Sequence, residues 1–506
     1  MKTKSRSNWK LGAAVGTALS LGSGAAVAGP HGFDLHNVFH GASAAMAGTS
    51  IAHVDDPVSA IFGNPATLTT YYGGTNFMFG ATFYMPRARM EHDGSAGYAT
   101  QLHGSYVAGT DSAGDGSVAA SSQSFDSTSK ADVYAVPTVG VTQDLTGLGI
   151  PVVLGVGVSA TSGIGVDYKH SSYSLGAAAE LINLGVNAGI GMSMTPNLDV
   201  GISATITYAM LEAGLTGSGG MTHDIGFRAT AGARYKMGNL TVGGYVQSEQ
   251  PHEYDNLHVT SFHGTRPFAQ LTSYGANATV DCNGDGVSAS AGVCRQDVRV
   301  EQPMNIGLGF AYSGMMNGNL TVMADFTHKA WSDAQFFNEF YEDQEVYSVG
   351  LQLTQGPMKW RLGYGYADDP LLATVQEGKH IATIGGINSS GENYTSPMFG
   401  LFMSYFQAME TPVIYKHRIT AGLGIDGFLA PMLSLDTHVA FQLEEDKCFG
   451  AGQDGLTDAT TVYESGMTAK GISLTNTADV SGCAIKDHTK ATVSSFHLGG
   501  ALTWTF

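Results

Sequence analysis

Segments of about ten residues in which apolar side chains alternate with polar or small ones recur along almost the whole chain after Tyr71. In one of them Ile225 and Phe227 fall on one face, while Arg228 and Arg234 fall on the other. Period-two alternation over about ten residues is typical of a strand that crosses a membrane with one face toward lipid. The chain is therefore expected to be built of strands.

The alternation predicts fourteen strands, at residues 75–90, 132–144, 151–167, 181–195, 198–212, 224–237, 240–251, 297–313, 319–331, 344–355, 358–367, 414–426, 431–443 and 493–506. Short connections alternate strictly with long ones, which lie at 91–131, 168–180, 213–223, 252–296, 332–343, 368–413 and 444–492. Short turns at one end and long loops at the other are expected of an outer-membrane barrel, whereas a soluble sandwich has no reason to keep such an order. The predicted fold is all-β, a 14-stranded antiparallel transmembrane β-barrel.

The N-terminus has the features of a secretory signal: basic residues, an apolar run from Leu11 to Leu21, and an A-x-A site ending at Ala28. We expect cleavage after Ala28; the other interpretation is a membrane-anchoring helix. No later stretch offers the ~18 consecutive apolar residues of a spanning helix. Residues 29–72, rich in small side chains, are expected to form a hatch (plug) inside a barrel of residues 73–506.

The composition limits the partners and the compartment. A net charge of −19 argues against nucleic acid. The four cysteines fit an oxidising compartment, and of three possible pairings we favour the local ones, Cys282–Cys294 and Cys448–Cys483. With 13% charged residues and 68 glycines, the chain is either a secreted β protein or an outer-membrane barrel.

The last ten residues alternate and end on an aromatic residue, Phe506. This ending resembles the terminal signal by which the barrel-assembly machinery recognises bacterial outer-membrane proteins. The expected location is the outer membrane of a Gram-negative bacterium, with outer-membrane lipid and lipopolysaccharide as surroundings and a monomer as the assembly state.

Several segments together resemble the FadL family of outer-membrane channels for long-chain fatty acids and hydrocarbons. They are Gly32–Leu35, Gly41–Gly48, Asp55–Pro57, the Asn64-Pro65-Ala66 element, and parts of the strands at 303–312, 320–331, 361–370, 417–424 and 433–441. The resemblance implies a hatch-filled barrel that takes up fatty acids or hydrocarbons and releases them sideways through the wall. It also implies that Asn64, Pro65 and Ala66 shape a gating turn; the alternative is a plain structural turn.

Two groups of apolar residues in predicted outer loops are candidates for ligand capture. Phe399, Leu401, Phe402 and Phe406 form one group, and Phe336 and Phe337 belong to the other. Exposed apolar patches mark contact with ligands or membranes. Packing into the barrel mouth is an equally open interpretation.

Four arginines are expected on inward faces: Arg228, Arg234, Arg361 and Arg418. Each could hold a substrate carboxylate, with Arg228 and Arg361 as our tentative choices. The alternative is pairing with inward acids such as Asp325 or Asp436.

Asp281, Asn283 and Asp285 match the opening of a calcium loop, but the twelfth position is Gly292 instead of glutamate. A weak calcium site and an Asx-rich turn both fit, and no resident cofactor is expected. The sequence has no G-x-S-x-G nucleophile elbow, so an enzyme is not expected. The alternatives to hydrophobic uptake are a non-specific porin and a surface adhesin or lipid-modifying outer-membrane protein.

Overall fold

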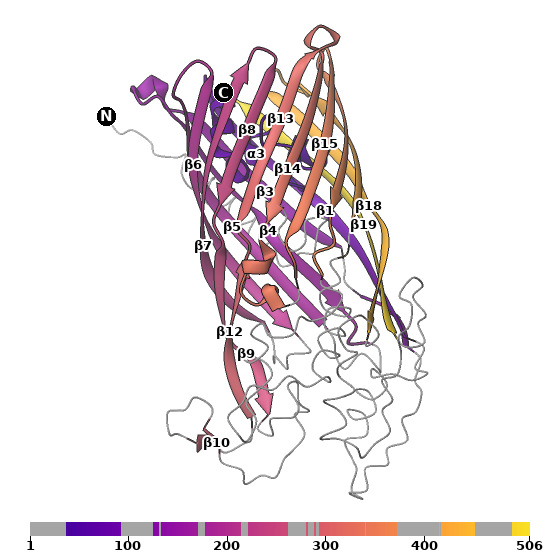
Figure 1. The fold of residues 1–506 in the computed structure, drawn as a ribbon. Coiled ribbons are helices and arrows are strands. Elements are labelled where there is room, and N and C mark those ends of the chain that lie inside the picture. Colours follow the sequence, from indigo (N-terminus) through magenta and orange to yellow (C-terminus); the bar gives the residue numbers. More distant parts are fainter. Residues whose placement is uncertain are drawn as a thin grey trace, which may run out of the picture.

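Fourteen antiparallel strands close on themselves into a barrel in the computed structural model of the chain (Figure 1). The last strand, β19, pairs with the first, β1, along a ladder that runs from Asn76↔Thr505 to Glu91↔Lys490. A closed sheet leaves no exposed edge, and it is one of the two backbone arrangements that satisfy every hydrogen bond inside a bilayer. The predicted fold class is confirmed. The structure describes residues 37–92, 125–130, 133–170, 178–213, 221–261, 280–281, 288–289, 293–339, 341–371, 414, 416–450 and 488–506.

The barrel strands are β1 (Thr75–His92), β3 (Tyr134–Asp144), β4 (Val153–Asp167), β5 (Ala178–Ser193), β6 (Leu198–Ala213), β7 (Thr222–Met237), β8 (Leu240–Gln247), β13 (Asn305–Met315), β14 (Leu320–Lys329), β15 (Gln344–Gln355), β16 (Met358–Ala367), β17 (His417–Ile425), β18 (Leu433–Gly450) and β19 (His488–Thr505). The remaining strands are β2 (Phe125–Thr128), β9 (Gln250–Ser261), β10 (Val280–Asp281), β11 (Ser288–Ala289) and β12 (Val293–Gln302). Short helices are α2 (Gly41–Ala44), α3 (Pro57–Phe62), η1 (Pro65–Tyr71), η2 (Thr146–Leu148), η4 (Met316–Gly318), η5 (Trp331–Asp333) and η6 (Phe337–Glu339).

Side-chain burial follows the alternation read from the sequence. On β7, Ile225 and Phe227 are 67% and 58% exposed on the outer face, whereas Arg228 and Arg234 are each 4% exposed on the inner face. Because consecutive residues of a strand point to opposite faces, the pattern fixed which residues line the lumen.

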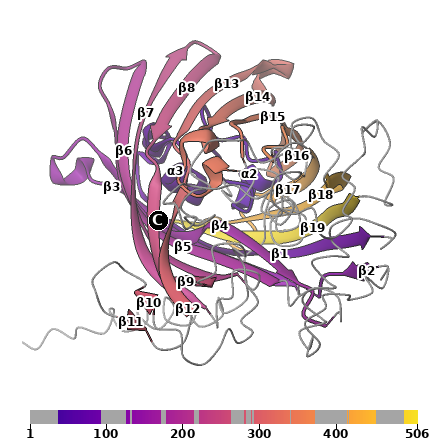
Figure 2. The ribbon, with the colours of Figure 1, turned by 60° about the horizontal axis from the view of Figure 1, so that its bottom comes forward.

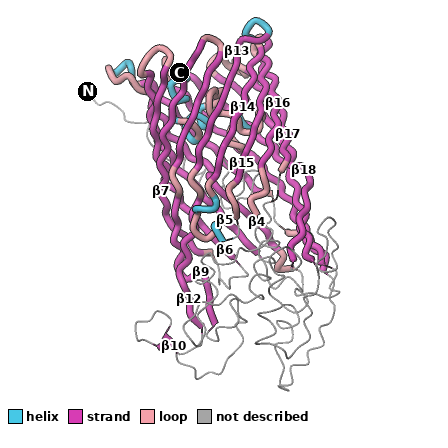
Figure 3. Tube along the Cα trace, in the orientation of Figure 1, coloured by secondary structure: helices cyan, strands magenta, loops and turns pink. Residues whose placement is uncertain are grey.

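Short turns join the strands at the end of the barrel where the C-terminus lies, and Figure 3 shows them as brief loops between long strands. None of the helices in the described ranges is long and apolar enough to cross a membrane.

Two of the expected strands are broken, which corrects the prediction of continuous strands at 240–251 and 297–313. β8 ends at Gln247 and β13 begins at Asn305, and beyond these points β9 pairs only with β12. β9 lies against the inner faces of β6 and β7, where the Gln250 amide donates to Thr207 Oγ1 at 2.8 Å. The break contains Pro303, which has no N–H to donate to a ladder.

The N-terminal segment fills the lumen, and we call the described part of it, residues 37–72, the hatch. Figure 2 shows α2 and α3 inside the ring of strands. Every residue from Asn37 to Thr69 is buried except His53 and Asp55, which are half-buried. The hatch therefore has wall on all sides, as the sequence predicted.

The carboxylate of Asp56 holds the hatch together. It accepts hydrogen bonds from the backbone N–H groups of Ala42 (3.1 Å), Ser43 (3.2 Å) and Ser59 (2.8 Å), and from the Ser59 hydroxyl (2.7 Å). Asp56 is also the N-cap of α3, so one side chain joins both α-helices of the hatch. Burial raises the pKa of Asp56, and the donors on Ser59 and Ser43 oppose that effect.

Replacing Asp56 by Asn should loosen the hatch. Asp56→Asn keeps the shape but turns one acceptor oxygen into an NH₂ group facing donors, which leaves buried N–H groups unpaired at about 1–3 kcal/mol. Hydrogen–deuterium exchange should show the amides of Ala42 and Ser43 exchanging on the order of tenfold faster. The control is Asp144→Asn, at the half-buried end of β3. Unchanged exchange in Asp56→Asn would contradict the role of Asp56.

Candidate functional site

The Asn64-Pro65-Ala66 turn is fixed to both the hatch and the wall. The Asn64 amide donates to the carbonyl of Ile51 (2.8 Å) within the hatch and to the carbonyl of Ala233 (3.1 Å) on β7. Its side-chain oxygen accepts from the N–H of Ala66 at 3.1 Å and caps η1. Pro65 occupies the first position of η1, where a missing N–H costs nothing. Asn64 thus uses both ends of its side chain to hold the turn; a gating role stays a prediction.

Glycines in the wall allow this turn to touch the barrel backbone. A Cβ on Gly201 would lie 2.4 Å from the carbonyl carbon of Pro65, and one on Gly232 would lie 2.0 Å from Asn64 Oδ1. Similar contacts recur around the lumen, at Gly140, Gly155, Gly191, Gly243, Gly309, Gly350, Gly363 and Gly422. The wall therefore carries glycine where the hatch approaches it most closely.

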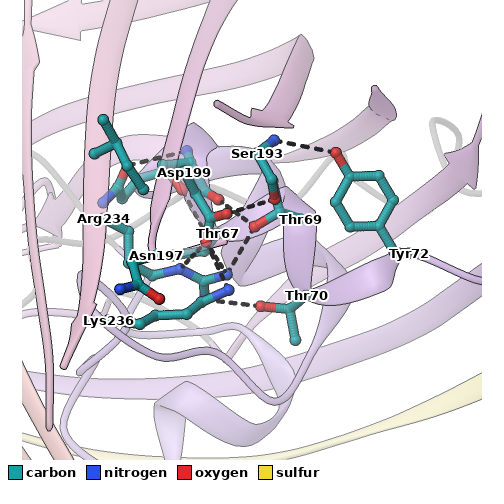
Figure 4. Close-up of polar contacts among 12 residues, drawn as sticks. Thr67, Thr69, Thr70, Tyr72, Ser193, Asn197, Asp199, Arg234 and Lys236 are labelled. Carbon is teal, nitrogen blue, oxygen red and sulfur yellow. Dashed lines mark hydrogen bonds and ion pairs between the residues drawn. The ribbon is translucent and has the colours of Figure 1, made fainter. Parts of the chain in front are cut away.

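Arg234 anchors the end of the hatch, as Figure 4 shows. Its guanidinium pairs with Asp199 at 2.8 Å and donates to the hydroxyls of Thr69 (2.7 Å) and Thr70 (2.9 Å). Lys236 also pairs with Asp199, at 2.9 Å. The arginine predicted on the inner face of β7 thus joins the hatch to β6 and β7.

Arg361 and Arg228 also have partners within the protein. Arg361 pairs with Asp436 at 2.5 Å, as the alternative interpretation held, and its Nη2 lies 3.7 Å from Asp55 of the hatch. Burial raises the pKa of Asp55, but the hydrogen bond and charge of His53 and the charge of Arg361 outweigh it, so the net effect lowers that pKa. Arg228 donates to the backbone carbonyls of Ser248, at 2.7 Å, and Pro303.

The expected acid partner Asp325 is used differently. Its carboxylate accepts from the backbone N–H groups of Ser50 (2.7 Å) and Ile51 (3.0 Å), so β14 is bonded directly to the hatch. Arg418, on β17, donates from Nη2 to the carbonyl of Val38 at 2.7 Å. Arg234, Arg361, Arg418 and Asp325 thus each contact the hatch.

The aromatic candidates after β14 form a packed cluster. Phe337 is 2% exposed, and its ring lies 4.9 Å from that of Trp331 and 5.0 Å from that of Tyr341. Phe336 is half-buried beside Phe337, with ring centroids 5.4 Å apart. This arrangement is packing at one end of β14 and β15; a ligand role for these residues stays a prediction.

Several other predicted residues lie outside the part of the chain that the structure describes. Phe399, Leu401, Phe402, Phe406, Asn283, Asp285, Cys282 and Cys483 lie outside the described residues, and only the backbones of Asp281, Cys294 and Cys448 are described. The calcium site and the two disulfides stay predictions. In the described parts of the chain, no group of three His, Cys, Asp or Glu side chains could hold a metal ion.

One stretch of the wall lacks a ladder between neighbouring strands. β3 and β4 pair from Asp144↔Val153 only as far as Thr138↔Ser159. Beyond that, residues 134–137 form a ladder with β1 alone and residues 160–167 form one with β5 alone. At the far end of this stretch the Asp167 carbonyl accepts from the N–H of Lys130 at 2.8 Å. A β-bulge at Thr161 interrupts the register of β4 with β5. The barrel thus has an interrupted wall between β3 and β4.

A single apolar cluster spans this interruption. Its inward-facing members are Tyr84, Tyr134 and Val136 of the wall together with Val38 and Phe39 of the hatch. The cluster continues to Ala160, Ile182 and the partly buried Met210. Each of these lies four positions along its strand from an exposed, outward-facing residue, so each lies on the outer face; the exposed residues are Val156, Val186 and Ile206. Apolar contacts therefore run from the lumen to the outer face of the wall.

This interruption was not predicted, although one residue in the sequence marks it. Pro137 stands in the middle of β3, where it cannot donate a hydrogen bond to a neighbouring strand. Residues 162–166 are all buried, so the alternation of exposure along β4 ends just after the bulge, a change that only the structure reveals.

The sequence matches no protein-family model and no curated protein. The structure is similar to the toluene transporter TodX of Pseudomonas putida, with a TM-score of 0.55 and 16% identity over 94% of this chain and 99% of that one. It is also similar to a FadL homologue of Pseudomonas aeruginosa, with a TM-score of 0.56 and 13% identity over 94% of this chain and 100% of that one. The fold is that of the FadL-type channels.

A third FadL-type structure, the toluene transporter TbuX of Ralstonia pickettii, has a TM-score of 0.51 and 14% identity over 93% of this chain and 99% of that one. At such identities the likeness concerns architecture. The FadL-type fold suggested by the N-terminal motifs of the sequence is confirmed, and it extends over the described barrel and hatch.

A methyl group at Gly201 should push the hatch away from the wall. Gly201→Ala places a Cβ 2.4–2.6 Å from the backbone of Pro65 and Ala66, and overpacking of this kind typically costs about 1–3 kcal/mol. We expect the folded barrel to unfold at a lower temperature, measured by the shift of its band on a semi-native gel.

The matched control is Gly365→Ala. Gly365 is also a glycine of a barrel strand that faces the hatch, but its Cβ would lie 3.5 Å from that of Ala47, an ordinary contact. Equal unfolding temperatures for the two variants would contradict the close-approach argument.

Proposed function

We propose that this protein is an outer-membrane channel for the uptake of hydrophobic molecules, long-chain fatty acids or hydrocarbons, which leave sideways through the interrupted wall between β3 and β4. The observation that carries the proposal is the apolar cluster that runs from Val38 and Phe39 in the lumen to Ala160, Ile182 and Met210 across that interruption.

The free-energy cost of keeping apolar surface in water favours such a route. An apolar molecule in a wet pore keeps its surface in water, at about 25 cal/mol per Å². A passage lined by Phe39, Tyr134 and Val136 that opens toward the lipid avoids that cost. The hatch supports the same conclusion, because its buried residues occupy the space that an open pore needs.

The structural relatives support the substrate class. TodX and TbuX are described as toluene transporters, and CymD, with a TM-score of 0.50, as a monoaromatic hydrocarbon channel. We extend that class to this chain on the strength of its fold and its apolar cluster. Binding and passage, not catalysis, are the proposed activity.

The location follows from the same reasoning. A closed 14-stranded barrel with an apolar outer face suits the outer membrane of a Gram-negative bacterium. The proposal also includes export by a signal peptide at residues 1–28 and assembly through the barrel-assembly machinery. It further includes contact with lipopolysaccharide, a monomeric state and the disulfides Cys282–Cys294 and Cys448–Cys483.

Deleting Thr161 tests the exit. Removing the bulge residue should let the alternation of β4 run on, extend pairing toward residues 134–137 and close the interruption. Uptake of radiolabelled oleate or toluene, by cells whose own channels are deleted, should fall at least about tenfold if this is the exit. Thr161→Ala, which keeps the bulge, is the matched control and should keep wild-type uptake.

Three outcomes would contradict the proposal. Wild-type uptake by the folded deletion variant would exclude an exit between β3 and β4. A steady large conductance in planar bilayers would favour the porin alternative. Lipase activity of the pure protein, with no effect of gene deletion on uptake, would favour the lipid-modifying alternative.

A further inference from the structure

A buried polar cluster faces the lumen from the four strands β17, β18, β19 and β1. Arg418, Gln442 and Ser495 lie opposite one another in successive ladders, and His497 and Tyr84 form the next inward-facing row. Arg418 and His497 are each 0% exposed, and Gln442 is 2% exposed. These residues therefore surround one part of the lumen, next to the start of the described hatch.

Arg418 differs from the other three inward-facing arginines. Arg234 and Arg361 pair with Asp199 and Asp436, and Arg228 donates to two backbone carbonyls. Arg418 donates only from Nη2, to Val38, and among the described residues no carboxylate pairs with it. A buried charge without a counter-charge is expensive, so such a group is a candidate for binding an anion.

Several buried nitrogen atoms around Arg418 have no hydrogen-bond partner. They are Nε and Nη1 of Arg418, Nε2 of Gln442 and Nδ1 of His497. The oxygen of the Gln442 amide is already used, because it accepts from the hydroxyls of Ser495 and Tyr84. Hydrogen-bond donors of Arg418 and Gln442 are thus available, while the amide oxygen of Gln442 is occupied.

The surroundings of this cluster are apolar and aromatic. The Phe39 ring stacks on His497, with centroids 5.1 Å apart and 28° between the planes, and the Tyr84 ring meets His497 edge-on at 4.4 Å. Phe39 and Tyr84 belong to the apolar cluster that reaches the interrupted wall. Two neighbouring residues of the hatch therefore occupy this site. The Val38 carbonyl oxygen accepts from Arg418, and the hydrophobic ring of Phe39 stacks on His497.

We propose that Arg418, with Gln442 and His497, forms a binding site for the carboxylate of a hydrophobic acid, whose oxygen takes the place of the Val38 carbonyl and whose tail takes the place of Phe39. The inference rests on the proposed function and narrows its substrate class to carboxylic acids. A carboxylate supplies the counter-charge that the Val38 carbonyl lacks, and its two oxygens can accept two N–H groups of the guanidinium at once. A neutral hydrocarbon leaves the guanidinium unpaired.

The test compares an acid with its neutral ester. Dodecanoate and methyl dodecanoate compete with a fluorescent hydrophobic probe for the purified protein in detergent. We expect the wild-type protein to bind dodecanoate more tightly than the ester. Arg418→Met should weaken the binding of dodecanoate about tenfold or more, as expected for loss of a hydrogen bond to a charged group, and should change the affinity for the ester less than about twofold. Arg87→Met, at an exposed position of β1, is the matched control and should change neither.

A second variant guards against misfolding of the first. If Arg418→Met does not assemble, Gln442→Leu removes an unpartnered donor and keeps the charge. This variant should weaken the binding of dodecanoate a few-fold and leave the affinity for the ester unchanged. Equal binding of acid and ester by wild type, or equal loss of both in the variants, would overturn the carboxylate site and leave the uptake function standing. Failure of both probes to bind wild type would count against both the site and the function.

Discussion

The backbone of the hatch lies directly against the backbone of the barrel wall, and most other features of the structure depend on that close approach. Glycines such as Gly201, Gly232 and Gly363 make it possible, because any side chain there would overlap the hatch. Glycine weakens a strand by roughly 0.5–1 kcal/mol, so the wall gives up some intrinsic strand stability at these positions. In return, hatch amides come within reach of wall side chains such as Asp325 and Thr420.

Polar groups inside the lumen act mainly as links between hatch and wall. Arg234 joins η1 to β6 and β7, Arg361 joins β16 to β18 and approaches Asp55, and Asp56 joins the helices of the hatch to each other. Hydrogen bonds are stronger in such a water-poor interior, and unpaired groups are correspondingly costly. Arg418 is the contrast, since its one hydrogen bond goes to a backbone carbonyl of the hatch.

The hatch and the interrupted wall depend on each other. Where β3 and β4 stop pairing, an open gap would leave backbone groups unpaired, at several kcal/mol each in the proposed membrane location. Instead, residues 162–166 are buried, and Val38 and Phe39 pack behind Tyr134 and Val136. Movement of Val38 and Phe39 would therefore change both the polar cluster around Arg418 and the apolar cluster at the wall.

The sequence by itself determined the strands, their faces and the presence of the hatch. Arg228, Arg234, Arg361 and Arg418 were assigned correctly to the lumen, because the direction of a side chain in a strand depends only on its position. The strand ends at β15 and β16 also agree with the prediction.

Only the tertiary structure decided which of these groups meet. Arg361 pairs with Asp436 from two strands away, Asp325 bonds to the hatch, and the start of β9 lies against β6 and β7 beyond the break at Gln247. The interruption between β3 and β4 likewise depends on how two strands and Phe39 pack together. Local alternation carries no information about such contacts, because they join residues far apart in the chain and depend on the closure of the barrel around the hatch.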